Sequence, residues 1–477
     1  MVSLLILAPF FAAILLNVPF KALRERSAFG AALALFLGQM LLMIFPKAGL
    51  WTFPVATLDK FFHFPLRVDA LSTVLLFCIG AVLTATLLLS LRAVPQDERR
   101  LNFISVLLLM QAGMNGAVVV VDLFSLYVFL EIVAVSSFIL IAFDKHVHAF
   151  EAAFKYLVMS VVATALMLLS IALILLVSPD TTFSGISASL QGSPNSLLVT
   201  LAVGVFVCAA FIKSGLMPFH GWLPDAYSAA PAPVSVLLAG VVTKTVGIYT
   251  LLRIVIFVFG FTLPLKNILL AVGALSALAG ALAALAQTDF KRMLAYSSIS
   301  QMGYIILGLG CGTPLGALGA VFHLFNHAIF KSLLFSNSAA IESRAGIRNI
   351  QEMSGLGSRM PWTALTCAVG SLSTAGIPPL AGFWSKFIII IALWMSGNYT
   401  YAVIAILVSL LTLAYFLYLQ RNVFFGKAKD TFNKIEEAEF VILLPAIVFS
   451  AITFIVGVAF PWVWNTLLLR LPSIFGA

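Results

Sequence analysis

The chain has 477 residues, of which 62% are apolar and only 9% are charged, and its mean hydropathy is +1.11. A soluble domain carries about 25% charged residues, so this composition excludes a soluble globular protein. The net charge of +9 gathers in short loops between apolar runs, which indicates a lipid bilayer as the surroundings and no nucleic-acid partner.

Hydropathy predicts an all-α polytopic membrane protein with about fourteen transmembrane helices. Each apolar run is long enough to cross a bilayer core of about 30 Å. The runs are continuously apolar and do not alternate, so they indicate helices and not barrel strands. The expected spans lie near residues 2–19, 28–45, 69–91, 101–121, 123–143, 154–177, 197–217, 232–258, 265–286, 293–311, 315–338, 362–396, 400–420 and 440–460. The twelfth contains Gly376-Ile-Pro378-Pro379 and is therefore expected to be a broken helix.

Part of the chain resembles another part of itself. Phe154-Lys155-Tyr-Leu-Val-Met-Ser160 matches Phe330-Lys331-Ser-Leu-Leu-Phe-Ser336 at four of seven positions, and Pro218-Phe-His-Gly221-Trp222 is echoed by Pro379-Leu-Ala-Gly382-Phe383. Spans 4–8 thus pair with spans 9–13, and an odd number of crossings per unit predicts two inverted five-helix bundles, each with a broken helix. The expected organisation is three spans over residues 1–100, the first repeat over 101–258, the second over 259–423, and a cytoplasmic loop, span 14 and tail over 424–477.

The basic residues of the loops predict the orientation. Sixteen lie in odd-numbered loops, and six lie in even-numbered loops and the C-terminal tail. By the positive-inside rule the odd loops are cytoplasmic and both termini lie on the outer side. We expect the membrane to be the inner membrane of a prokaryotic cell. Arg253, a turn or so inside the end of its helix, is expected to snorkel to the interface.

Five basic residues lie within the predicted spans and away from their ends, and all five are lysines. A desolvated lysine can lose its proton near neutrality, whereas an arginine cannot. An unpaired charge at mid-bilayer costs about 2.5–3.5 kcal/mol, so this set indicates a pathway of titrating groups. For Lys155, near a helix start, a snorkelling side chain or a static ion pair is an equal alternative. The five are Lys155, Lys213, Lys244, Lys331 and Lys386.

Other titratable residues accompany the lysines. Glu131 lies mid-span, where a Glu–Lys pair would couple the proton affinities of its partners; the alternative is a fixed counter-ion. His323, His327 and Lys331 share one helix face and suit a proton relay. Two histidines at this spacing could bind a metal, but no third ligand is apparent. His220 follows a proline break and either joins the pathway or lines a vestibule.

The sequence indicates no cofactor, no metal site and no catalytic centre. Its four cysteines stand singly, without a C-x-x-C motif, which gives no ligand set for zinc or an iron–sulfur cluster. A phosphate-binding loop of the G-x-x-x-x-G-K-[ST] type is also missing. Transport must therefore be driven by an ion gradient or by the chemistry of a partner.

Five stretches together resemble the antiporter-like subunits shared by respiratory complex I, Mrp-type cation/proton antiporters and membrane-bound hydrogenases. The resemblance covers nearly the whole chain and is most specific in the proline-bracketed and AYSSI segments. The stretches are Arg67 to Ser72, Lys213 to Pro233, Asp289 to Tyr304, His323 to Phe335 and Gly376 to Phe387.

The resemblance implies an inverted repeat with two half-channels and no redox centre in this subunit. It implies a glutamate/lysine pair at Glu131 and Lys213, a central lysine at Lys244 and an exit residue at Lys386. The helix that bridges the halves falls on His323, His327 and Lys331. One departure follows Lys244, where the chain is one residue longer than the usual K-x-G-x-Y pattern. A π-bulge would absorb this residue; otherwise Lys244 points elsewhere.

The leading hypothesis is a proton-translocating, antiporter-like subunit of a multi-subunit membrane complex. Its partners would be other membrane subunits. The energy would come from a peripheral redox module of the quinone oxidoreductase or hydrogenase type, or, in an antiporter, from a Na⁺ gradient. One alternative is a self-sufficient secondary ion or solute transporter. Another is a scaffold that has lost conduction.

Overall fold

The computed structural model describes residues 2–17, 24–44, 66–96, 98–191, 196–429, 432 and 434–466. Within these ranges the chain is almost entirely helical, and its only β pairings are isolated bridges. Eleven of the described helices are long and apolar enough to cross a membrane, and α1 (Leu4–Leu16) and α16 (Ala381–Met395) are shorter apolar helices. The predicted all-α polytopic fold is confirmed. Some of the predicted features lie outside the described residues. They are residues 18, 19 and 45 of the predicted spans, the C-terminal tail from 467, and the loop cations Lys21, Lys47, Lys60 and Arg470.

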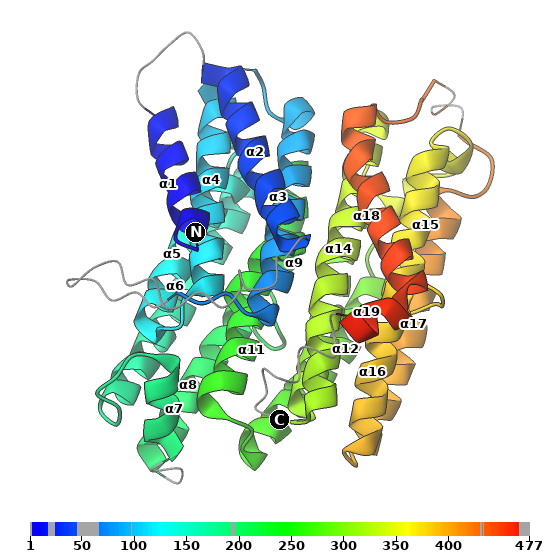
Figure 1. Cartoon of the computed structure of the whole chain (residues 1–477). Coiled ribbons are helices and arrows are strands. Elements are labelled where there is room, and N and C mark those ends of the chain that lie inside the picture. Colours follow the sequence, from blue (N-terminus) through cyan, green and yellow to red (C-terminus); the bar gives the residue numbers. More distant parts are fainter. Residues whose placement is uncertain are drawn as a thin grey trace. The chain divides into compact units, whose positions relative to one another are not determined.

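The helices form two compact units. Unit 1 comprises Met1–Leu87, Val94–Gly215 and Val241–Thr262. Within it, α4 lies beside α1, α2 and α5, and α6 lies between α5 and α8; these helices run from blue to green in Figure 1. Its helices are α1, α2 (Arg24–Ile44), most of α3 (Ala70–Ala93), α4 (Glu98–Val119), α5 (Leu123–Ile141), α6 (Val147–Leu175), α7 (Phe183–Gln191), α8 (Leu197–Ser214) and α11 (Thr250–Ile254).

Unit 2 comprises Leu88–Ala93, Leu216–Gly240 and Leu263–Ala477. Its central element is α14 (Pro314–Ala345), which packs against α10, α13, α15, α16 and α18. Its other helices are α9 (Trp222–Ala229), α10 (Ala232–Leu237), α12 (Leu263–Leu285), α13 (Phe290–Gly310), α15 (Pro361–Ala375), α16, α17 (Tyr399–Val423), α18 (Phe440–Val458), α19 (Phe460–Thr466) and the 3₁₀ turns η4 (Ile350–Glu352) and η5 (Leu356–Ser358). The four-part organisation expected from the sequence stays a prediction.

Local structure at two helix starts agrees with the internal repeat. The Asp122 carboxylate accepts a hydrogen bond of 2.7 Å from the Ser125 amide at the start of α5, and Asp289 accepts one of 2.8 Å from the Arg292 amide at the start of α13. Each aspartate also forms an isolated antiparallel bridge, to Thr182 and to Asn349 respectively. A side-chain oxygen at this position satisfies a backbone N–H that the helix leaves free. That the repeats are inverted stays a prediction.

Both predicted helix breaks are present. Helix α8 ends before Gly215 (φ +64°), and α9 begins only at Trp222. Helix α15 ends before Gly376 (φ +87°), and α16 begins at Ala381. A left-handed glycine ends a helix without steric cost, and the prolines that follow cannot supply the N–H that a continuing helix needs.

The segment after α10 departs from α-helical geometry. It continues as the π-helical stretches η1 (Leu238–Val242) and η2 (Lys244–Tyr249), then α11, then the π-helical η3 (Val255–Phe259). A π turn closes on the fifth residue instead of the fourth, so it accommodates an extra residue without breaking the helix. The π-bulge predicted for the longer spacing after Lys244 is therefore observed.

Candidate functional site

A glutamate and a lysine meet inside unit 1. The Nζ atom of Lys213, on α8, lies 3.2 Å from Oε1 of Glu131, on α5. The Lys213 side chain is only 2% exposed, and that of Glu131 is 30% exposed. The lysine also donates to Thr164 at 3.3 Å and to Ser160 at 3.4 Å, both on α6, and the Thr164 hydroxyl donates to Glu131. The sequence-predicted pair is thus in direct contact, among hydroxyls that can hydrogen-bond either partner.

The end of α8 places Lys213 at this centre. Lys213 lies in the last turn of the helix, two residues before the left-handed Gly215. The two hydroxyls from α6 are four residues apart and so lie on one face of that helix. In a buried Glu–Lys pair the proton affinity of each group depends on the charge of the other. The site can therefore store or release a proton when the pair separates.

Lys244 lies nearby in the same unit. It is fully buried at the start of η2, which packs against α8. Gly247, one turn further on, makes this packing possible: a Cβ added there would lie 2.6 Å from Cα and N of Ser214. Ser214 follows Lys213 directly, so the helix end that carries the first lysine rests on the π-helix that carries the second.

Arg253 is a correction to the expectation drawn from hydropathy. It does not snorkel: its side chain is 3% exposed and its guanidinium is ion-paired with Asp69, just before α3. Arg253 also donates to the Ser72 hydroxyl at 3.3 Å and lies over the Phe257 ring, 4.8 Å from its centroid. The expectation that lysines alone are buried was therefore wrong, because the carboxylate of Asp69, from a distant part of the sequence, compensates this arginine.

Lys155 is less enclosed than the other four lysines. Its side chain is 44% exposed on α6 and forms a 2.7 Å ion pair with Glu151, one turn earlier. The alternative of a local ion pair is what the structure shows. The protein interior thus contains four of the five predicted lysines, Lys213, Lys244, Lys331 and Lys386.

Unit 2 contains a row of titratable residues along α14. His323, His327 and Lys331 are all fully buried, and the two imidazole rings are stacked with centroids 6.3 Å apart. Nδ1 of His323 lies 2.8 Å from the Ser385 hydroxyl, on α16. Lys331 donates to the Ser297 hydroxyl at 2.7 Å and to the Leu294 carbonyl at 3.2 Å, both on α13. The predicted single face is confirmed as one line of adjacent groups.

Lys386 extends this row. It lies in the first turns of α16, just after the break, with its side chain against Gly376. Its Nζ atom lies 4.5 Å from the centroid of the Tyr304 ring, and that ring lies 5.7 Å from the His323 ring. Among the described residues the Lys386 ammonium group has no hydrogen-bond partner. Lys386, Tyr304, His323, His327 and Lys331 thus follow one another through unit 2.

His220 lies apart from the row. It is half-buried in the break before α9, and its ring centroid lies 6.3 Å from that of Tyr296. Asp225, on α9, forms a 2.8 Å ion pair with Arg292 at the start of α13. This position agrees with the vestibule alternative.

Sequence reasoning also missed a second buried ion pair. Lys291, assigned there to a loop, is the second residue of α13; its side chain is 2% exposed and its Nζ atom lies 2.8 Å from Oε2 of Glu342. The sequence did contain a clue to this position: Asp289 is a suitable residue to cap a helix start, and a helix that begins after it includes Lys291.

The described residues contain no group of three or more His, Cys, Asp or Glu side chains able to hold a metal ion.

Comparison with known proteins places these features in context. Residues 120–412 match the family described as NADH:quinone oxidoreductase/Mrp antiporter, TM. The chain is 32% identical to a Na(+)/H(+) antiporter subunit from Alkalihalophilus pseudofirmus, over 83% of this chain and 81% of the relative. It is 35% identical to an NADH-quinone oxidoreductase subunit from Desulforudis audaxviator, over 76% of this chain and 72% of the relative.

The fold is also found in a solved structure. A chain of the Mrp complex from Dietzia sp. DQ12-45-1b superposes with a TM-score of 0.91 at 24% identity, covering 99% of this chain and 97% of that one. This identity is too low to transfer function, so the likeness shows the fold alone. With the apolar helices described above, it shows an integral membrane protein.

Proposed function

Because the chain belongs to the NADH:quinone oxidoreductase/Mrp antiporter transmembrane family, we propose that it is a proton-translocating, antiporter-like subunit of a multi-subunit membrane complex. The observation that carries this proposal is the contact between Glu131 and the buried Lys213 at the end of a broken helix. A charged pair of this kind is costly inside a membrane protein and is a functional candidate by default.

In unit 1, separation of the pair would be the gating step. With Glu131 in contact, Lys213 holds its proton; when the carboxylate moves away, the desolvated ammonium group releases the proton more readily. Lys244 is the proposed next acceptor, since the packing of Gly247 on Ser214 brings its helix against the end of α8. This geometry supports one half-channel in unit 1.

In unit 2, the row along α14 is the proposed second half-channel. Lys331, His327 and His323 would pass a proton toward Lys386, the proposed exit residue. Histidine suits this task because one ring nitrogen can accept a proton while the other donates one. We keep His220 as a proposed vestibule residue and leave Lys155 outside the pathway.

The driving force and the surroundings are part of the proposal. Relatives named as antiporter and quinone oxidoreductase subunits support other membrane subunits as partners, with either a Na⁺ gradient or a peripheral redox module as the energy source. The proposed location is the inner membrane of a prokaryotic cell with both termini on the outer side, which rests on the distribution of loop cations.

The test is Lys213→Ala in the intact complex, reconstituted into vesicles with an interior pH dye. We expect coupled proton movement to be abolished while the complex still assembles, because the alanine leaves Glu131 without its titrating partner. Lys427→Ala, which removes an exposed loop lysine, is the control and should retain full activity. Normal coupling in the Lys213 variant would refute the mechanism.

A further inference from the structure

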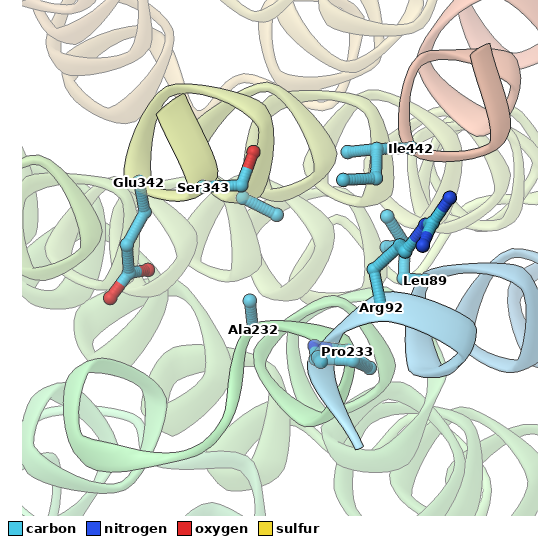
Figure 2. Close-up of a pocket in the computed structure, with 9 residues that line it drawn as sticks. Leu89, Arg92, Ala232, Pro233, Glu342, Ser343 and Ile442 are labelled. Carbon is cyan, nitrogen blue, oxygen red and sulfur yellow. The ribbon is translucent and has the colours of Figure 1, made fainter. Parts of the chain in front are cut away.

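Unit 2 contains a pocket of about 330 Å³ at one end of α14. The last turn of α3, the start of α10 and the start of α18 contribute the other walls through Arg92, Ala232, Pro233 and Ile442. Figure 2 shows the carboxylate of Glu342 on one side of the pocket and the guanidinium of Arg92 on another, with small apolar side chains between them. A pocket of this volume has room for several water molecules.

The carboxylate that lines the pocket is also the partner of the buried Lys291. Oε2 of Glu342 contacts the Lys291 ammonium at 2.8 Å, and its side chain is 32% exposed against 2% for the lysine. Glu342 therefore lies at a boundary, with the pocket on one side and a desolvated lysine on the other.

Further charges surround this pair. The Arg348 guanidinium lies 3.9 Å from Glu342 and 3.4 Å from Asp289. Across the pocket, Arg92 is ion-paired at 2.5 Å with Glu439. The Glu342 carboxylate therefore lies within 4 Å of two cationic groups, the ammonium of Lys291 and the guanidinium of Arg348.

Helix α13 connects this pair to the titratable row. Lys291 lies at the start of α13, and the next two turns of the same helix supply the Leu294 carbonyl and the Ser297 hydroxyl that hold Lys331. The axial rise from residue 291 to residue 297 is about 9 Å at 1.5 Å per residue. The pocket, the ion pair and the row are therefore consecutive features of one helix pair, α13 and α14.

From this arrangement we infer that Glu342 and Lys291 form the proton-loading site of unit 2, with hydronium in the pocket as the ligand; this inference rests on the proposed function. A proton from hydronium binds the Glu342 carboxylate, leaves water behind and cancels the charge that holds Lys291. The Lys291 ammonium then gives its proton inward toward the Lys331 region. The neutral Glu342 carboxyl finally reprotonates the Lys291 amine, which restores the ion pair.

A purely structural pair would fasten α13 to α14 but would not need to be open to water. Ala339 makes this difference testable, because it lines the pocket one turn before Glu342 and is only 5% exposed. In the intact complex, Ala339→Cys should react with a small membrane-impermeant thiosulfonate, and mass spectrometry can assign the label to that peptide. Labelling should lower proton flux at least tenfold and leave the unlabelled variant active. A cysteine that stays unlabelled, as in a pocket filled by lipid, or a label without effect on flux, would overturn the inference.

The second experiment changes the acid itself. Glu342→Gln should reduce proton flux at least tenfold in vesicles and leave assembly unchanged, and Glu342→Asp should restore part of it. Glu352→Gln, an exposed carboxylate in the following loop, is the matched control. If Lys213→Ala blocks flux and Glu342→Gln does not, the loading site is wrong and the proposed function stands. If Lys213→Ala also leaves flux normal, the proposed function fails.

Discussion

At the scale of single residues, identical sequence motifs occupy different surroundings. Phe154-Lys155 on α6 and Phe330-Lys331 on α14 are repeat counterparts, yet Phe154 is 65% exposed and Phe330 is 1% exposed. The exposed lysine pairs with a neighbour one turn away, whereas the buried one depends on hydroxyl and carbonyl groups of another helix. Burial, and not the motif, therefore decides which lysine belongs to the titratable row.

This contrast gives a paired prediction for Lys386 and Lys155. Lys386→Ala should lower proton flux by about tenfold or more, because it removes the last titrating group of the row in unit 2. Lys155→Ala should change flux by less than twofold, since an exposed i,i+4 pair contributes only about 0.3–0.5 kcal/mol. Both variants would be measured in the same reconstituted complex. A larger loss for Lys155→Ala than for Lys386→Ala would contradict the assignment.

At the scale of elements, the breaks and the π-helix position the lysines. Each break begins with a left-handed glycine, and a buried lysine lies two residues before Gly215 or ten residues after Gly376. The π-helical turn at Lys244 lets an extra residue fit while the helix continues toward Arg253. Irregular backbone of this kind is typical of transport pathways in membrane proteins.

Gly247→Ala tests the contact between α8 and η2. A methyl group there would overlap the backbone of Ser214, so the helices must separate. Overpacking of this type costs about 1–3 kcal/mol. We expect a lower unfolding temperature and a loss of proton flux, measured by thermal unfolding in detergent and by the vesicle assay. Gly204→Ala on α8 is the control, because nothing lies within 4 Å of its added Cβ, and it should retain or slightly raise stability.

Most of the helices and site contacts were predictable from the sequence, and the residues that were wrongly predicted share a cause. The apolar runs, the proline-marked breaks and the shared face of His323 and Lys331 follow from hydropathy and helical spacing, whereas the pairing of Glu131 with Lys213 was implied by the family resemblance. Lys291 and Arg253 were misjudged because a hydropathy window places charged residues at span ends, although a carboxylate from a distant segment can hold such a charge inside. Those partners depend on tertiary contacts that no local pattern contains.

At the scale of the whole molecule, the two units contain separate sets of titratable groups. Unit 1 contains Glu131, Lys213 and Lys244, and unit 2 contains the row from Lys331 to Lys386 with the Glu342–Lys291 pair. In the proposed function, the energy for net transport comes from a partner or from an ion gradient.

Purification of the full chain from native membranes tests this requirement. We expect several other hydrophobic subunits to co-purify in fixed proportion, identified by mass spectrometry, and the isolated chain alone to move no ions. A peripheral redox protein in the same preparation would indicate a redox drive, and only small hydrophobic partners would indicate an antiporter. Full ion transport by the chain without partners would favour the self-sufficient transporter instead.

The position of Lys386 above Tyr304 has a kinetic consequence. The face of an aromatic ring attracts a cation through its quadrupole, and it offers no lone pair to which the ammonium protons can be anchored. The charge is thus held by a diffuse field, with the ring 4.5 Å away. A proton can leave such a group without first breaking a directed hydrogen bond, so Lys386 is suited to releasing its proton rapidly. Lys213, by contrast, donates hydrogen bonds to a carboxylate and two hydroxyls and is suited to retaining its proton.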